Sequence, residues 1–184
     1  MSRLGWRLLG GFEGMTPMNS KRLSERKKQP GHDRSFRTSE KNFIAAAEEV
    51  LDLNRYAVDD HPKDLQALFS DSEGTLGIIP EASITSLKTG RKFFVEVKKQ
   101  GAGGNAEERA FKHHTVQFYK TLQERFGYSY HPFVTVFCEN LATDRRYTLK
   151  FEHLIEPDNY FLWSEYDQEI LEVYLNERCE EWLD

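Results

Sequence analysis

Residues 96–109 read EVKKQGAGGNAEER, and this stretch joins the end of an expected strand to the start of an expected helix. Glu96 and Lys98 are two positions apart, so their side chains share one face of a strand. A cluster of glycines follows, and Asn105 then occupies a position where a helix N-cap residue is favoured. The stretch therefore predicts a strand that carries an acid and a base, placed directly before a polar helix start.

A partner strand is predicted immediately before this one. Residues 74–85 and 91–100 are rich in β-branched or aromatic residues, and Gly90 lies in the turn between them. Pairing of the two strands would bring Glu81 near Glu96, although the pattern leaves their register open. The hairpin thus predicts that two carboxylates and one lysine meet on the same side of a sheet.

The rest of the chain alternates between helical and extended patterns. Apolar residues at helical spacing predict helices, and β-branched or aromatic runs predict further strands. The expected helices cover residues 39–56, 61–70, 105–126 and 166–183, and the further strands cover 131–140 and 146–154. In a chain of 184 residues, this order predicts a single α/β domain whose helices flank a central sheet.

The composition excludes several classes of protein. Hydrophobic residues make up 39% and aromatic residues 13% of the chain, which is typical of a globular domain. No apolar run approaches the roughly 18 residues of a membrane span, so no membrane partner is expected. Cys138 and Cys179 lack the spacing of a zinc site or a disulfide framework. Two such cysteines favour a reducing, cytoplasmic location.

The charge is distributed unevenly along the chain. Residues 1–38 carry nine Lys or Arg against three acids, whereas the last 34 residues carry eleven acids against Arg178 alone. We expect residues 1–38 to form a basic, flexible arm and residues 39–184 to form the folded domain. The arm either wraps DNA or serves only as a solubilising tail, and the charge pattern does not distinguish the two.

The acid–base strand has a chemical interpretation. Hydrolysis of a phosphodiester requires a hard divalent cation, a positioned water molecule and stabilisation of the developing charge. Carboxylate oxygens suit Mg²⁺, and a neighbouring lysine can orient or deprotonate the water. Glu81, Glu96 and Lys98 form such a set, but ion pairs on a strand surface give the same spacing. These residues alone therefore leave a metal-dependent nuclease and an ordinary charged strand both open.

The expected helix start has features that helix capping does not explain. Asn105 and Glu108 suit the positive end of a helix, whereas Arg109 lies in the first turn, where the helix dipole disfavours a cation. The preceding glycines leave the backbone bare. Asparagine pairs with adenine in bidentate fashion, and arginine reaches purine N7 or phosphate. These residues favour a helix N-terminus that enters the major groove of DNA.

Three motifs together resemble the PD-(D/E)XK nucleases: PE at 80–81, EVK at 96–98 and GNAEER at 104–109. Within that superfamily the chain resembles type II restriction endonucleases of the EcoRI/MunI type, from about Ser39 to the C-terminus. The resemblance implies a restriction-endonuclease-like core with a five-stranded mixed sheet, and a homodimer that cuts both strands of an AATT-containing palindrome. It also implies dependence on Mg²⁺, with Mn²⁺ as a substitute, and products with 5′-phosphates and 5′ overhangs.

The same resemblance implies roles for individual residues. Glu81 and Glu96 match the two metal-ligand positions, and Lys98 matches the catalytic lysine. The positions that match DNA-reading residues are Gln100, Gly103, Gly104, Asn105, Ala106, Glu108 and Arg109. Enzymes of this type belong to restriction–modification systems in the prokaryotic cytoplasm, beside a cognate DNA methyltransferase.

Two positions depart from the family's pattern. The family usually has aspartate where this chain has Glu81, and an arginine where this chain has Gly103. The first departure leaves a second interpretation open, a catalytically weak or silent protein that binds specific DNA. The second departure leaves the outer base pair of the recognition site undetermined. A repair nuclease of the same fold is a third alternative, against which the complete GNAEER motif argues.

Two further pairs of residues have less specific interpretations. His113 and His114 are adjacent on the expected helix and so do not share a face, which favours packing over metal binding. Arg145 and Arg146 are candidates for phosphate contacts only.

Overall fold

The computed structural model describes residues 40–100 and 104–184, and its centre is a mixed sheet. The strands are β1 Tyr56–Asp60, β2 Ala82–Ser86, β3 Lys92–Lys98, β4 Phe133–Cys138 and β5 Tyr160–Trp163. Their order across the sheet is their order along the chain. β1, β2 and β3 pair antiparallel, whereas β3, β4 and β5 pair parallel. The five-stranded mixed sheet that the resemblance implied is therefore confirmed.

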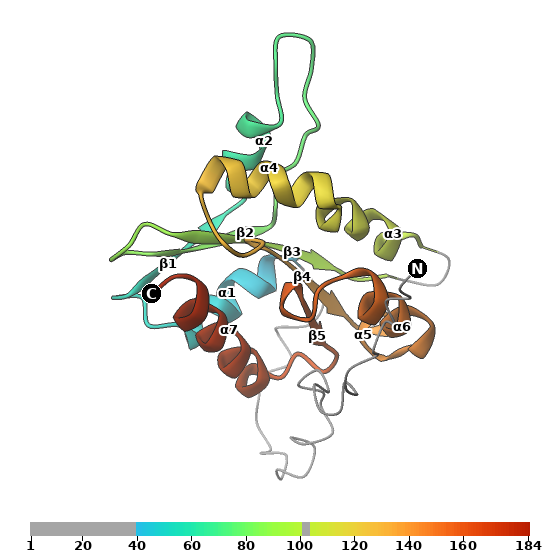
Figure 1. Cartoon of the computed structure of the whole chain (residues 1–184). Coiled ribbons are helices and arrows are strands. Elements are labelled where there is room, and N and C mark those ends of the chain that lie inside the picture. The colour runs from blue at the N-terminus through green and yellow to red at the C-terminus, as the bar shows by residue number, and fades with distance from the viewer. Residues whose placement is uncertain (1–39, 101–103) are drawn as a thin grey trace, which may run out of the picture.

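Helices cover both faces of this sheet (Figure 1). They are α1 Glu40–Val50, α2 Asp64–Leu68, α3 Ala106–Phe111, α4 Val116–Phe126, α5 Asn140–Thr143, α6 Arg145–Leu154 and α7 Gln168–Trp182, with 3₁₀ turns at Lys112–His114 and Pro157–Asn159. α1 and α7 pack on one face, and α3 and α4 lie along the other. The result is a layered α/β domain, as the alternating pattern predicted.

The alternation of side chains along β3 divides the interior into two parts. Phe93, Val95 and Val97 pack with α1 and α7, whereas Phe94 packs with α2 and α4. Both faces of the strand are covered, which explains its nearly continuous burial. Glu96 and Lys98 lie on the Phe94 face, because side chains two apart share a face. The acid and the base are thus placed under α3 and α4 and not on a solvated surface.

The prediction of a strand at residues 146–154 is wrong, because this segment forms α6. Asp144 starts the helix, since its Oδ1 accepts a hydrogen bond of 2.9 Å from the Arg146 N–H. Tyr147 and Phe151 are buried one turn apart, while Leu149 between them is 43% exposed. A strand would have placed all three on one face. Helical spacing explains the observed burial, and alternation does not.

The helix expected at residues 105–126 is interrupted. Thr115 adopts an extended conformation with φ −74° and ψ 148°, and its Oγ1 accepts a 3.2 Å hydrogen bond from the Phe118 N–H. This cap begins α4 as a new helix, so α3 is a separate and short one. The helix expected at residues 39–56 also ends early, at Val50.

Two further observations concern membrane-spanning helices and the expected residues that the structure does not describe. Within residues 40–100 and 104–184, no helix is both long and apolar enough to cross a membrane. The expected arm, residues 1–38, lies outside the described residues, and so does Gly103.

Candidate functional site

The three candidate catalytic side chains meet at the end of the β2–β3 hairpin. Ala82 pairs with Val95, so Glu81, one residue earlier, stands opposite Glu96. The Glu81 Oε2 accepts a 3.0 Å hydrogen bond from the Val97 N–H, and its Oε1 lies 3.6 Å from the Lys98 Nζ. Lys98 also forms an ion pair with Glu96. The register that the sequence left open therefore brings both carboxylates to one lysine.

This cluster is buried, and burial changes the chemistry of Glu81. Glu81 and Glu96 are each 8% exposed and Lys98 is 9% exposed. The pKa of Glu81 is raised to about 8, first by burial and then by a hydrogen bond with Glu96 and by that group's charge, while Lys98 and the Val97 N–H act to lower it. Burial and the neighbouring carboxylate thus favour the protonated form of Glu81. A divalent cation would compete with that proton.

The donor set fits a magnesium ion. Mg²⁺ takes one or two carboxylates from a protein and keeps several waters, so two facing glutamates are sufficient. Among the described residues, no group of three or more His, Cys, Asp and Glu side chains is placed to hold a metal.

The residues expected to read DNA lie at the start of α3. Gly104, Asn105, Glu108 and Arg109 are exposed, and Ala106 is half-buried. Asn105 occupies the N-cap position, but its side chain makes no capping hydrogen bond. Glu108 lies in the first turn of α3, but the expected position of Arg109 in that turn is wrong, because α3 has only six residues and Arg109 lies in its last turn, where the helix dipole does not disfavour a cation.

Gln100 differs from these residues because it is buried. It is only 4% exposed, and its Oε1 accepts a 2.6 Å hydrogen bond from the Ala106 N–H. Its Nε2 donates a 3.0 Å hydrogen bond to the Tyr147 hydroxyl. Both ends of the amide are thus used inside the protein, between β3, α3 and α6.

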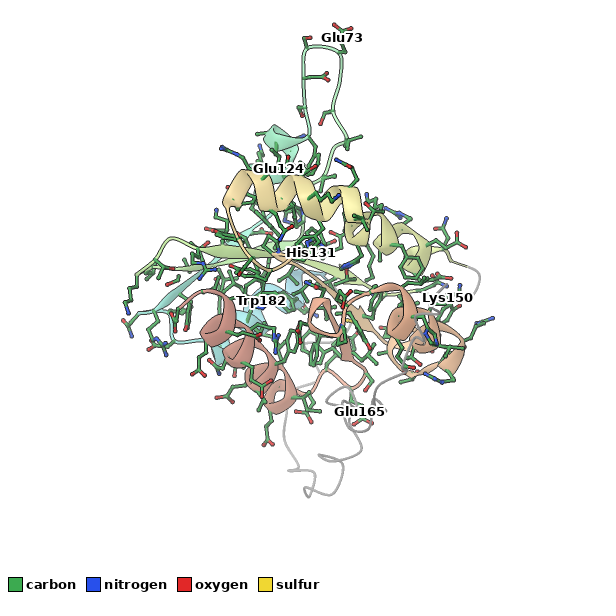
Figure 2. All side chains as sticks on the ribbon, in the orientation of Figure 1. Glu73, Glu124, His131, Lys150, Glu165 and Trp182 are labelled. Carbon is green, nitrogen blue, oxygen red and sulfur yellow. The ribbon has the colours of Figure 1, made fainter. Side chains whose placement is uncertain are left out.

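A second contact between α3 and α6, an ion pair, was not predicted from the sequence. Glu107 is 6% exposed, and its Oε1 lies 3.3 Å from the Lys150 Nζ. Figure 2 shows Lys150 in the region between these two helices. The helical spacing that places Lys150 toward α3 was not recognised, because the pattern of residues 146–154 predicts a strand. In α6, Tyr147 and Lys150 are three apart and share a face, so both reach the α3 side.

The adjacent His113 and His114 both pack against Phe133, with ring centroids 4.5 Å and 6.0 Å from its ring. His114 Nε2 lies 2.8 Å from the Thr135 Oγ1, and His131 Nε2 lies 2.8 Å from the backbone oxygen of His113. Thr135 pairs in register with Glu96, so this contact lies beside the carboxylate cluster. Burial lowers the pKa of His114 to about 3 and that of His131 to about 4. These rings are neutral packing groups beneath α4, where Figure 2 shows His131.

Known proteins resemble the chain in both sequence and structure. A family model described as Type II restriction enzyme MunI matches residues 18–184. The crystal structure of MunI restriction endonuclease in complex with cognate DNA is similar with a TM-score of 0.59 and 24% sequence identity, over 80% of this chain and 90% of that chain. No curated protein sequence matches. The family match spans the carboxylate hairpin and the start of α3.

Proposed function

The chain belongs to the MunI family of type II restriction enzymes, and we propose that it cuts double-stranded DNA at a palindrome with an AATT core. Membership of the family makes it a type II restriction endonuclease, and the proposal concerns its sequence and its chemistry. The supporting observation is the buried cluster in which the Lys98 Nζ lies 3.6 Å from the Glu81 Oε1 and pairs with Glu96. This cluster lies beside an exposed helix start that carries Asn105 and Arg109.

We propose that Glu81 and Glu96 hold the catalytic cation. Mg²⁺, or Mn²⁺ in its place, would supply a Lewis acid for the phosphoryl oxygens when bound. The Lys98 side chain is held between the carboxylates. As an ammonium it would orient the attacking water, and as a neutral amine it would accept that water's proton. The positive charge of the ammonium also offsets charge that develops on the phosphorus oxygens. In-line attack by water on phosphorus would break the P–O3′ bond, and the departing 3′-oxygen would take up a proton from solvent, which gives a 5′-phosphate and a 3′-hydroxyl. Staggered cuts in the two strands would then leave 5′ overhangs.

Sequence reading belongs to the exposed start of α3 in this proposal. Asn105 is free of a capping role and has the donor–acceptor pair that adenine N6 and N7 require. Arg109, one turn further, reaches a purine or a phosphate, and Glu108 restrains it. Gly103 and Gly104 lack a side chain, which permits close approach of the backbone, and Ala106 presents a small apolar surface to thymine.

The proposal extends to the partners of the enzyme. A palindromic site is read by two identical subunits related by two-fold symmetry, so we infer a homodimer on DNA. A cognate DNA methyltransferase of the same restriction–modification system would protect the host's own sites, and both would act in the prokaryotic cytoplasm. The basic arm, residues 1–38, would add phosphate contacts outside the folded domain, residues 39–184.

Plasmid cleavage by alanine variants tests the catalytic assignment. Glu96→Ala and Lys98→Ala are expected to abolish cleavage with either Mg²⁺ or Mn²⁺ while the protein remains folded. Glu124→Ala and Lys120→Ala, which remove exposed charges of the same types from α4, serve as matched controls and retain cleavage. Full activity in Glu96→Ala and Lys98→Ala would refute the assignment.

A second function is favoured by one observation, the presence of Glu81 where the family usually has aspartate. A protein whose metal site no longer binds or positions the cation would bind its specific DNA without cutting it. Gel-shift assays with the wild-type protein and a divalent cation distinguish the two. Specific binding with no cleavage in Mg²⁺ or Mn²⁺ would establish the binding protein.

A further inference from the structure

The side chain of Gln100 connects the catalytic strand to the DNA-reading helix. Gln100 follows Lys98 by two residues, and its Oε1 accepts the Ala106 N–H at 2.6 Å. This N–H is one of those that a helix leaves without an intrahelical partner at its N-terminus. Asn105 occupies the N-cap position without making a side-chain capping bond, and Gln100 satisfies the N–H of the first helical residue. The first turn of α3 is thus attached to β3 by a side chain from outside the helix.

Gly104 shows how closely these parts are packed. A Cβ atom at residue 104 would lie 2.7 Å from the Gln100 Cγ and 3.1 Å from its Cδ. The first of these distances is shorter than real Cβ contacts allow, and it involves the stem of the side chain, which cannot move without breaking the Ala106 bond. Glycine at this position therefore permits Gln100 to reach α3, in addition to any approach to DNA.

Tyr147 holds the other end of the same amide. Its hydroxyl accepts hydrogen bonds of 3.0 Å from the Gln100 Nε2 and 3.0 Å from the Arg146 Nη2. Tyr147 is 9% exposed, and the Arg146 guanidinium lies 4.6 Å from the centre of its ring. Since Tyr147 is anchored in α6, it fixes the orientation of the Gln100 amide, with the oxygen toward α3 and the nitrogen toward α6.

We propose that Gln100 and Tyr147 are positioning residues that set the DNA-reading start of α3 relative to Lys98. The inference rests on the proposed function and assigns Gln100 a role other than direct contact with a base, because both ends of its buried amide are occupied within the protein. A site held to within about 1 Å by supporting hydrogen bonds loses rate and selectivity when that support is removed. Because the hydrogen bonds of Gln100 join α3 to the strand that carries Lys98, Lys98 is correctly placed only when α3 is correctly docked on DNA.

Amide hydrogen exchange tests the link in the DNA-free protein. Tyr147→Phe removes one hydroxyl and keeps the ring, and Gln100→Leu removes both hydrogen bonds of the amide. Both variants are expected to exchange faster than wild type, by about three- to tenfold, in peptides covering residues 104–111. Tyr119→Phe is the matched control, because the Tyr119 hydroxyl accepts a 2.8 Å hydrogen bond from the Gln123 Nε2 on α4. Unchanged exchange at residues 104–111 in Tyr147→Phe would overturn the proposal.

Single-turnover cleavage tests the consequence for selectivity. The probes are a duplex with the site mapped for the wild-type enzyme and the same duplex with one base pair of that site changed. Tyr147→Phe is expected to lower the ratio of the two rate constants by about three- to tenfold, and Tyr119→Phe to leave it unchanged. A purely structural role would reduce the active fraction and slow both duplexes equally, so an unchanged ratio would also overturn the proposal.

The two experiments separate the failure of the link from the failure of the proposed function. A wild-type protein that cuts no DNA refutes the nuclease, and the exchange comparison then still decides whether Gln100 and Tyr147 hold α3. In that case, the affinity ratio for specific and shuffled duplexes replaces the ratio of rate constants. An affinity ratio unchanged in Tyr147→Phe overturns the positioning role, and a lowered one supports it.

Discussion

Shortening Glu81 to the aspartate that is usual in the family is expected to weaken this enzyme. In the structure, the Glu81 Oε2 accepts the Val97 N–H at 3.0 Å, and its Oε1 lies 3.6 Å from the Lys98 Nζ. Aspartate is shorter by roughly one C–C bond, about 1.5 Å. With the backbone unchanged, the oxygen would withdraw to about 4.5 Å from the Val97 nitrogen, beyond hydrogen-bond range. The glutamate is therefore matched to this hairpin.

The expected loss follows from that displacement. A hydrogen bond to a charged group contributes about 1.5–3 kcal/mol, and a displacement of about 1 Å within a catalytic set costs on the order of a hundredfold in rate. Glu81→Asp should therefore cleave cognate DNA about a hundredfold more slowly under single-turnover conditions in saturating Mg²⁺. Glu73→Asp, on the exposed loop whose tip Figure 2 labels, is the matched control. A Glu81→Asp protein as fast as wild type, or faster, would show that the length of Glu81 is not matched to this hairpin.

Three further predictions concern recognition, packing and pH. Arg109→Ala should lose about 1–3 kcal/mol of discrimination per contacted base pair. The measurement is the ratio of cleavage rate constants for the mapped site and for sites with one base pair changed. Arg125→Ala on α4 should retain the wild-type ratio. Phe151→Ala removes a fully buried ring and should lower the free energy of unfolding in urea by about 3–5 kcal/mol, so a loss below about 1 kcal/mol would contradict the packing. In a Glu81→Gln protein, which removes the opposing effect of the raised Glu81 pKa, the free energy of unfolding should fall as the pH drops from 7.5 to 5. Below the usual histidine pKa of 6.5, the unfolded chain binds protons that the folded chain excludes, which costs on the order of 1–2 kcal/mol for each of three histidines. A free energy independent of pH over this range would contradict the neutral, buried state of His113, His114 and His131.

The β2–β3 hairpin was predictable because its signals are local. β-Branched and aromatic residues on both sides of Gly90 indicated two strands, although β2 runs only over Ala82–Ser86 and not over the expected 74–85. Alternation placed Glu96 and Lys98 on one face. The register was not predictable, because it depends on how the strands pack against the helices and on the turn. The structure supplies it, and with it the contact of Glu81 with the Val97 N–H.

Other parts of the fold were not predictable from local patterns. The run Tyr147, Leu149, Phe151 alternates as a strand would, and only the Asp144 cap and the exposure of Leu149 identify a helix. β1 and β5 are short, so their patterns were weak. The use of Gln100 inside the protein depends on Tyr147, and this contact between distant segments became visible only in the folded chain.

The most direct test of the account is to sequence the ends of a plasmid of known sequence after incubation with the wild-type protein and Mg²⁺, beside the Lys98→Ala variant. If the proposed function is correct, all ends of the wild-type products fall at one palindrome with an AATT core, with 5′-phosphates and 5′ overhangs, and Lys98→Ala leaves the plasmid intact. Ends scattered over unrelated sequences, or the same ends produced by Lys98→Ala, would contradict it.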